Sequence, residues 1–260
     1  MKCITMVVAH KTVDIPLKNG YKIINVGPNE VQIEGAMRDN SGDNIAYKNP
    51  NYCELTAHYW FWKNYKEDYD YVGLAHYRRF LSSNYFTNNP KYYICQDNIE
   101  KYIKNVDVLL PEKFVFDCTV AEFYLKGAGI KKDFDNTREV IKNIYPEYVE
   151  AFDYCTSSNT GSYCNMFYMK KSDFEAYSKW LFDVLFELEK ITDLTGYTPA
   201  EARIYGYLSE LLLNVWIIKN EKRTKCLPMA VSDPGRKSYL LFRINSYLGK
   251  VKNNRLFKRR

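Results

Sequence analysis

The sequence lacks the glycine-rich motifs that identify several large classes of enzyme. It contains no G-x-x-x-x-G-K-[S/T], no G-x-G-x-x-G and no G-x-S-x-G. The first pattern cradles phosphates in ATPases, the second binds dinucleotides in oxidoreductases, and the third presents the nucleophilic serine of many hydrolases. These three classes therefore lose their usual support.

Long apolar runs and paired cysteines are also missing. A membrane-spanning helix needs roughly 20 apolar residues, whereas the best candidate, 211–218, is short and contains Asn214. The opening run MKCITMVVAHK predicts a buried first strand rather than a signal peptide, because it has no small-residue cleavage site. The seven cysteines form no C-x-x-C pair, which favours a reducing compartment and disfavours structural zinc. We therefore expect a cytoplasmic protein.

The net charge of +6 is concentrated at one end of the chain. Residues 236–260 hold nine Lys and Arg and no Asp or Glu, so removing these nine charges leaves −3 for the other 235 residues. Nucleic-acid-binding domains usually carry a basic stripe on the folded body. We therefore expect a domain over 1–232 that does not bind nucleic acid. A basic, amphipathic helical tail over 233–260 would bind the inner face of the plasma membrane.

The most informative stretch is 51–80, which reads NYCELTAHYWFWKNYKEDYDYVGLAHYRRF. Its first half predicts a helix with Asn51 as the N-cap and Glu54 closing a capping box. The helical period places four residues on one buried face, namely Tyr52, Leu55, Tyr59 and Trp62. Its second half, 71–75, is a short apolar run that predicts a strand.

Polar residues follow this predicted strand directly: His76, Tyr77, Arg78 and Arg79. Ligands of open α/β sheets bind at the carboxyl ends of strands. Two arginines and a histidine supply fixed N–H donors there, which suit an anion such as a diphosphate. The alternative is a solvated strand end whose arginines pair with surface carboxylates.

Strand and helix patterns alternate along the rest of the chain. The longest loop-like stretch is 35–51. The further expected elements are strands over 107–110, 161–170 and 224–231, and helices with capping patterns at Asn136, Ser172 and Thr198. This alternation predicts a single Rossmann-like α/β domain with a mostly parallel central sheet.

Three histidines, His10, His58 and His76, can in principle form a catalytic zinc site. Their spacing contains no H-x-H or H-x-x-x-H pair, and His58 falls within the predicted helix, where we expect it to bond Glu54 or to be exposed. Two D-x-D pairs, 68–70 and 133–135, resemble the metal-binding carboxylates of many nucleotide-sugar transferases. The first pair precedes its strand and the second lies at a predicted helix start, so neither pair is expected to bind a metal.

Arg203, Gly206 and Glu210 share one stripe of the helix that starts near Thr198. A glycine inside a helix costs about 1 kcal/mol relative to alanine and usually has a packing or functional reason. If the stripe faces a cleft, Glu210 can act as a general base or can orient a histidine or arginine. Otherwise the glycine serves packing and the two charges pair elsewhere.

The segments ELTAHYWFWKN and YVGLAHYRRF resemble the signature of a bacterial glycosyltransferase family that was long catalogued as a domain of unknown function. That family occurs in capsular, exopolysaccharide and O-antigen loci. The segments CNMFYMKK and ARIYGYLSELLL also resemble it, and the resemblance covers about 1–232. One departure is Ala46, where the family pattern would more often carry Ser.

The resemblance implies a GT-A-type nucleotide-sugar transferase in which the H-Y-R-R segment replaces the usual metal-binding aspartates. Its implied catalytic residues are Glu210, His76, Arg78 and Glu54. Its implied donor-binding residues are Ala9, His10, Lys11, Asp43, Asn44, Tyr77, Arg79, Asn165 and Arg203, with Met166 beside Asn165. No metal ligands are assigned; we expect that no cofactor is required, with Mn²⁺ or Mg²⁺ as the alternative.

We therefore expect transfer of a hexose from a UDP-sugar to a lipid-linked surface polysaccharide, at the inner membrane surface. In this hypothesis the H-Y-R-R cluster stabilises the leaving diphosphate, and Glu210 or Glu54 activates the acceptor hydroxyl. One alternative is a metal-dependent hydrolase or phosphodiesterase that uses His10, His58 and His76. The other is a non-catalytic module that binds glycan or nucleic acid.

Overall fold

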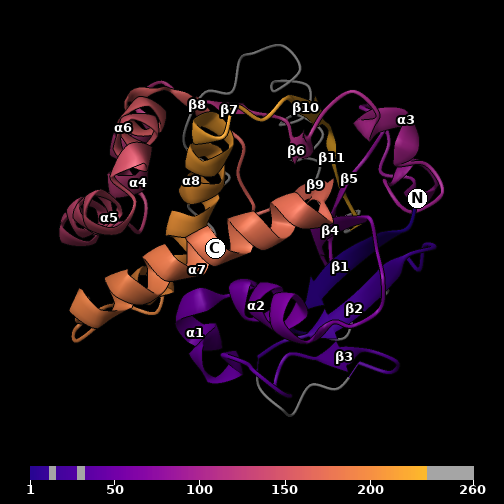
Figure 1. The fold of residues 1–260 in the computed structure, drawn as a ribbon, viewed down its shortest axis with the longest axis horizontal. Helices are drawn as coiled ribbons and strands as arrows, with labels where there is room; N and C mark the ends of the chain where they lie inside the picture. The colour runs from indigo at the N-terminus through magenta and orange to yellow at the C-terminus, as the bar shows by residue number, and fades with distance from the viewer. Residues whose placement is uncertain (12–15, 28–32, 233–260) are drawn as a thin grey trace.

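The computed structural model describes residues 1–11, 16–27 and 33–232, which form a mixed α/β fold around one large sheet (Figure 1). The main path of the sheet has the order β10-β6-β9-β4-β1-β2-β3, and β5 joins β4 to β11. The strands are β1 (Cys3–Ala9), β2 (Tyr21–Asn25), β3 (Met37–Arg38), β4 (Tyr71–His76), β5 (Arg79–Leu81), β6 (Val108–Pro111), β9 (Phe167–Lys170), β10 (Thr224–Leu227) and β11 (Met229–Val231). A separate pair consists of β7 (Phe114–Val115) and β8 (Thr160–Gly161).

The strands in the first third of the chain pair mainly in parallel. β1 pairs in parallel with β2 and with β4, and β2 pairs in parallel with β3. β6 and β10 are also parallel, whereas β9 runs antiparallel between β4 and β6. The predicted α/β class with a mostly parallel central sheet is confirmed. The predicted basic tail, 233–260, lies outside the described residues.

The helices cover the sheet and extend beyond it (Figure 1). They are α1 (Asn49–Tyr52), α2 (Leu55–Asn64), α3 (Glu100–Ile103), α4 (Val120–Lys126), α5 (Lys131–Ile144), α6 (Val149–Ser157), α7 (Lys171–Ile191) and α8 (Ile204–Lys219). Short 3₁₀ turns are η1 (Ala46–Lys48), η2 (Pro90–Tyr92), η3 (Pro146–Tyr148) and η4 (Glu201–Arg203). α7 packs on β9 and α2, α8 packs on α7 and α6, and α4, α5 and α6 form a group beyond α8. Among the described residues, the helices include none with the length and apolar character to cross a bilayer.

The predicted helix from Asn51 is divided into two helices. α1 ends at Tyr52 and α2 begins at Leu55, because Cys53 adopts a left-handed backbone conformation with φ 53°. Asn51 caps no helix, since its side chain donates to the backbone oxygen of Ala202 at 2.7 Å. The predicted capping role of Asn51 and Glu54 is therefore wrong. Cys53 and Glu54 therefore form a sharp corner between α1 and α2 and belong to neither helix.

The bounds of several other helices and strands also differ from the predictions. The helix expected from Asn136 already begins at Lys131, and α7 begins without a side-chain cap from Ser172. The capping box of Thr198 forms, with the Glu201 amide donating to its hydroxyl at 3.3 Å, but it opens the 3₁₀ turn η4 before α8. The expected strand over 224–231 is divided into β10 and β11.

β4 and β9 approach each other closely at Gly73. A Cβ atom placed on Gly73 would lie 2.3 Å from a ring carbon of Tyr168. That ring is fully buried, and its hydroxyl accepts from Thr5 Oγ1 at 3.0 Å and donates to the Ile94 oxygen at 2.8 Å. The glycine therefore permits the strand pairing that carries β4 to its C-terminal end.

We expect Gly73→Ala to lower the free energy of unfolding by about 1–3 kcal/mol, because the added methyl group overpacks a site that cannot relax. Urea denaturation measures this loss. As a control, the same substitution in a Tyr168→Leu background should cost much less, since the smaller side chain leaves room for the methyl group. An equal cost in both backgrounds would show that contact with Tyr168 is not the reason for the glycine.

Candidate active site

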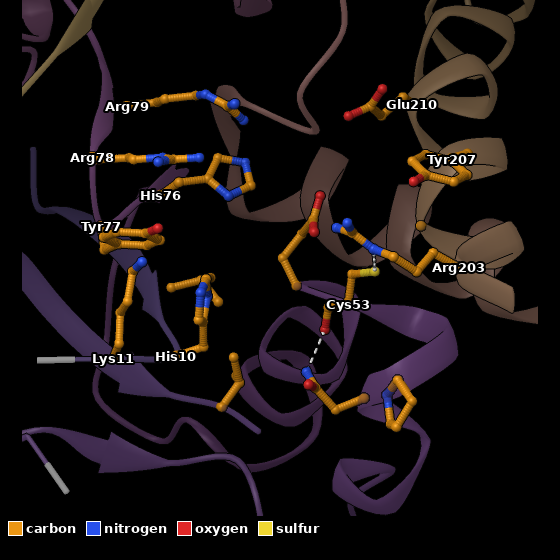
Figure 2. A pocket seen from close by; sticks show the side chains of 16 residues that line it. His10, Lys11, Cys53, His76, Tyr77, Arg78, Arg79, Arg203, Tyr207 and Glu210 are labelled. Atoms are coloured by element: carbon orange, nitrogen blue, oxygen red, sulfur yellow. Dashed lines mark hydrogen bonds between the residues drawn. The ribbon is translucent and has the colours of Figure 1, made fainter. Parts of the chain in front are cut away.

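A cleft of about 510 Å³ opens at the C-terminal ends of β1, β2 and β4 (Figure 2). Its walls come from segments that are far apart in the sequence: the ends of these strands, the α1–α2 corner, and η4 with α8. The lining residues are Val8, His10, Lys11, Val26, Asn49, Pro50, Cys53, Glu54, His76, Tyr77, Arg78, Arg79, Arg203, Gly206, Tyr207 and Glu210. The cleft lies where open α/β sheets bind their ligands.

One wall is the tight turn between β4 and β5. His76 and Arg79 are paired across this hairpin, which leaves Tyr77 and Arg78 in the turn. The turn is anchored on both sides, because the Tyr77 amide donates to the Val8 oxygen at 2.9 Å and the Ser232 amide donates to the Arg78 oxygen at 3.1 Å. The cations of the turn are therefore presented on a fixed backbone.

Tyr77 is the platform for the charges on this wall. The ring of this buried side chain lies 5.7 Å from Lys11 Nζ and 5.4 Å from Arg78 Cζ. The His10 ring meets it edge-on at a centroid distance of 4.9 Å. A cation over an aromatic ring gains about 0.5–1 kcal/mol at exposed sites and more where water is excluded. Tyr77 thus stabilises positive charge on two sides of the ring.

The pKa of His10 is shifted by burial and by the charges around it. Its pKa is lowered first by burial and then by the nearby charges of Lys11, Arg78 and Arg203. The Glu54 carboxylate acts in the opposite direction and does not reverse the shift. The imidazole is therefore neutral at pH 7. The nearby cations therefore add to burial in disfavouring a positive charge on His10.

The facing wall is formed by α8 and the α1–α2 corner. Arg203 Nε donates to Cys53 Sγ at 3.1 Å. Burial raises the pKa of the Cys53 thiol to about 11, so this sulfur is neutral at pH 7. A Cβ atom on Gly206 would lie 3.0 Å from the same sulfur, and the glycine therefore allows α8 to reach the corner. In Figure 2, Glu210 lies on this wall and faces Arg78 and Arg79 across the cleft.

Nine of the predicted site residues line this single cleft: His10, Lys11, Glu54, His76, Tyr77, Arg78, Arg79, Arg203 and Glu210. Of the two alternatives for the stripe of Arg203, Gly206 and Glu210, the structure has the one in which the stripe faces a cleft. Ala9 is fully buried in β1, directly before the cleft residues His10 and Lys11.

Asp43 and Asn44 do not line the cleft. The Asp43 carboxylate accepts from the Tyr59 hydroxyl at 3.0 Å, and the Asn44 side chain accepts from the Ala46 amide at 3.2 Å. Both side chains therefore bond within their own loop or to α2, and their expected contact with the donor stays a prediction.

Asn165 and Met166 also lie outside the cleft lining. They precede β9 rather than belonging to it. Met166 is fully buried, and Asn165 is 3% exposed with its amide directed at Glu54 Oε1, 2.8 Å away. Asn165 therefore contacts the cleft residue Glu54 from behind, and the expected direct contact of Asn165 and Met166 with a sugar or acceptor stays a prediction.

His58 does not belong to this site. Its side chain is 1% exposed, stacks on Phe174 at 4.9 Å and has Nε2 2.7 Å from Ser178 Oγ. The expectation that it bonds Glu54 or is exposed is wrong, because it lies on the face of α2 that packs on α7. Since only His10 and His76 line the cleft, the three-histidine hydrolase arrangement is contradicted.

The two D-x-D pairs have structural partners. Asp70 accepts from the Lys2 amide at 2.7 Å, at the opposite end of β4 from the cleft. Asp133 is buried and accepts from the Tyr197 hydroxyl at 2.7 Å. Within the described ranges, no three His, Cys, Asp or Glu side chains are grouped to hold a metal ion.

Several cleft residues were not predicted. Tyr207 lies one turn after Arg203 on α8, and its ring is 5.5 Å from the guanidinium carbon, so the helical spacing could have identified it. Cys53 and Asn49 carried no such signal. They reach the cleft because the chain turns sharply at Cys53, where the Asn49 amide donates to the Cys53 oxygen at 2.9 Å.

The sequence profile of the family described as "Domain of unknown function (DUF4422)" matches residues 4–221. The chain therefore belongs to this family, and the predicted membership of a domain-of-unknown-function family is confirmed. A solved structure described as "WbbM bifunctional glycosytransferase apo structure" is similar, with a TM-score of 0.79 and 32% sequence identity. The alignment covers 90% of this chain and 46% of that one, so the chain spans about half of that protein's length. No curated protein sequence matches.

The buried His58 makes stability depend on pH. Burial lowers the pKa of His58 to about 3, whereas the unfolded chain has the ordinary value of 6.5. Below pH 6.5 the unfolded state therefore binds a proton that the folded state does not, and stability falls with falling pH. This one group should cost about 2 kcal/mol between pH 7 and pH 5.

Urea denaturation of the protein and of His58→Gln at the two pH values measures this effect. The loss of stability on acidification should be about 2 kcal/mol smaller in the variant, which has no group to protonate at this site. Equal losses would mean that His58 is not neutral in the folded protein.

Proposed function

We propose that the protein is a glycosyltransferase that moves a hexose from a nucleoside-diphosphate sugar, UDP-linked, to an acceptor hydroxyl. The observation that carries this proposal is the convergence of four cations and two carboxylates in one cleft at the ends of parallel strands. The cations are Lys11, Arg78, Arg79 and Arg203, and the carboxylates are Glu54 and Glu210. The similarity to a structure described as a bifunctional glycosyltransferase supports the same class of reaction.

The cations suit the leaving group of such a transfer. When the bond between the sugar carbon and the diphosphate oxygen breaks, negative charge develops on the diphosphate. Guanidinium groups offer fixed forks of N–H donors for phosphate oxygens, and Arg78 and Arg79 stand on an anchored turn. Preorganised donors of this kind stabilise a developing charge without reorganising during the reaction. We assign the diphosphate to this wall, together with Lys11 and Tyr77.

The carboxylates suit the acceptor. In an inverting transfer, the acceptor oxygen forms the new bond to the sugar carbon while its proton passes to a base. Glu54 and Glu210 are the acidic residues of the cleft lining, and we propose one of them as this base. His76 Nε2–H donates to the Cys164 oxygen at 2.6 Å, which orients the imidazole ring in the cleft wall.

We further propose a lipid-linked intermediate of a surface polysaccharide, such as capsule, exopolysaccharide or O-antigen, as the acceptor. The nine Lys and Arg of residues 236–260 support this assignment, because basic segments bind anionic membrane surfaces with about 1 kcal/mol per residue. The arrangement of fixed cations supports activity without an added divalent ion.

Binding of the donor can be measured by thermal stabilisation. A ligand that binds only the folded state at 100 times its Kd adds about 2.7 kcal/mol of stability. We expect UDP or a UDP-sugar to raise the melting temperature in EDTA as much as in Mn²⁺. Arg78→Ala should weaken this binding about 10–100-fold, because it removes a charge-assisted contact.

The matched control is Arg138→Ala, since Arg138 is an exposed arginine that pairs with Asp153 at 2.7 Å on the surface. Its loss should leave nucleotide binding unchanged. Stabilisation that requires Mn²⁺ would overturn the metal-independent part of the proposal. A panel of nucleotide sugars that produces no stabilisation at all would overturn the assigned function.

The base can be identified from Glu54→Gln and Glu210→Gln. Loss of the base should lower kcat about 10²–10⁴-fold and leave donor binding within a few-fold of the original. The control is Glu187→Gln, a surface residue paired with Lys190 at 2.6 Å. If both cleft variants retain full turnover of the donor with its acceptor, neither carboxylate is the base.

A further inference from the structure

The chain makes an uncommon corner just before β9. Cys164 and Asn165 are consecutive residues in the left-handed region, with φ values of 74° and 49°. Both are buried, at 3% exposure each. Residues other than glycine adopt this conformation at a cost, and such strained positions persist at functional sites when surrounding contacts hold them.

The Asn165 amide faces three acceptors. Its Nδ2 lies 2.8 Å from Glu54 Oε1, 2.8 Å from Ser209 Oγ and 3.3 Å from the Gly206 oxygen. The Ser209 hydroxyl donates its own hydrogen to the Gly206 oxygen at 2.8 Å, so it accepts from Asn165. A carboxylate, a carbonyl and an accepting hydroxyl all require a donor. The orientation of the amide is therefore fixed by its surroundings.

The preceding residue holds a second cleft side chain. His76 Nε2 donates to the Cys164 oxygen at 2.6 Å. His76 comes from β4 and Glu54 from the α1–α2 corner, and both line the cleft. Two adjacent residues of a third segment thus fix groups on two other elements. The corner at Cys164 and Asn165 therefore connects the wall that carries His76 to the carboxylate of Glu54.

We propose that Asn165 is a positioning residue that holds the Glu54 carboxylate in its reactive orientation. The bond to Oε1 leaves Oε2 without a protein partner in the part of the chain that the structure describes, while Glu54 lines the cleft. That oxygen is available to an acceptor hydroxyl. The inference rests on the proposed function and selects Glu54 over Glu210 as the base.

A purely structural role would look different. Asn214 of α8 also binds the segment that precedes β9. The Ser162 amide donates to Asn214 Oδ1 at 2.9 Å, and Asn214 Nδ2 donates to the Ser162 oxygen at 2.7 Å. Asn214 does not line the cleft. Asn214→Ala therefore removes a comparable clamp without touching Glu54, and it serves as the matched control.

Asn165→Gly tests the proposal cleanly, because glycine keeps the left-handed backbone and removes only the side chain. We expect kcat to fall about 100-fold, as for a small misplacement of a reacting group, while the KM for the donor stays within about threefold. Asn165→Asp places a second carboxylate against Glu54, so the pH below which activity is lost should move upward. Asn214→Ala should lower the melting temperature and leave kcat and the pH profile in place.

A double-mutant cycle in urea gives a readout that does not depend on activity. Asn165→Gly and Glu54→Gln should be non-additive in unfolding free energy, because the two residues are in contact. Unchanged kcat in Asn165→Gly, or an additive cycle, overturns the positioning role. Non-additivity in a protein that turns over no nucleotide sugar supports the Asn165–Glu54 pairing and overturns the proposed function, so the two failures are distinguishable.

Discussion

Like charges that are held together in a partly desolvated cleft repel each other, and this molecule holds Lys11, Arg78 and Arg203 in that condition. The repulsion is visible at His10, whose pKa these three cations lower in addition to the effect of burial. The surrounding structure compensates for the repulsion. Tyr77 provides an aromatic face to two of the cations, and the thiol of Cys53 accepts from the third. Each of these partners lies beside the cation that it stabilises.

The second wall depends on a local break in helical geometry. A continuous helix through 51–64 would carry Cys53 and Glu54 along the helix line, whereas the left-handed Cys53 directs both towards α8. The absence of a side chain at Gly206 lets α8 approach that corner to van der Waals distance of the sulfur. The break at Cys53 and the glycine at position 206 therefore both contribute to one contact, in which α8 packs against the α1–α2 corner.

The sequence predicted those features that depend on neighbours along the chain. The strand before His76, the cluster of cations after it and the shared stripe of Arg203 and Glu210 follow from period and order, and the structure places them in one cleft. Features that depend on distant partners were missed. Periodicity could not show that Cys53 reverses the backbone, that His58 faces α7, or that Asp43 bonds Tyr59. Each of these features depends on contacts with residues that lie beyond the few neighbours from which a periodic pattern is read.

The corner at Cys164 and Asn165 shows how strain and charge are connected. Two left-handed residues in succession are unfavourable by themselves, and their contacts with Glu54, Ser209 and His76 compensate for part of that cost. Those contacts in turn fix a carboxylate opposite a wall of cations. Groups on fixed backbone positions cannot relax fully towards each other, so the repulsion among the cations and their separation from the carboxylate are built into the cleft. An anion that enters it meets donors that are already oriented, and this preorganisation is what makes electrostatic stabilisation effective in a transition state.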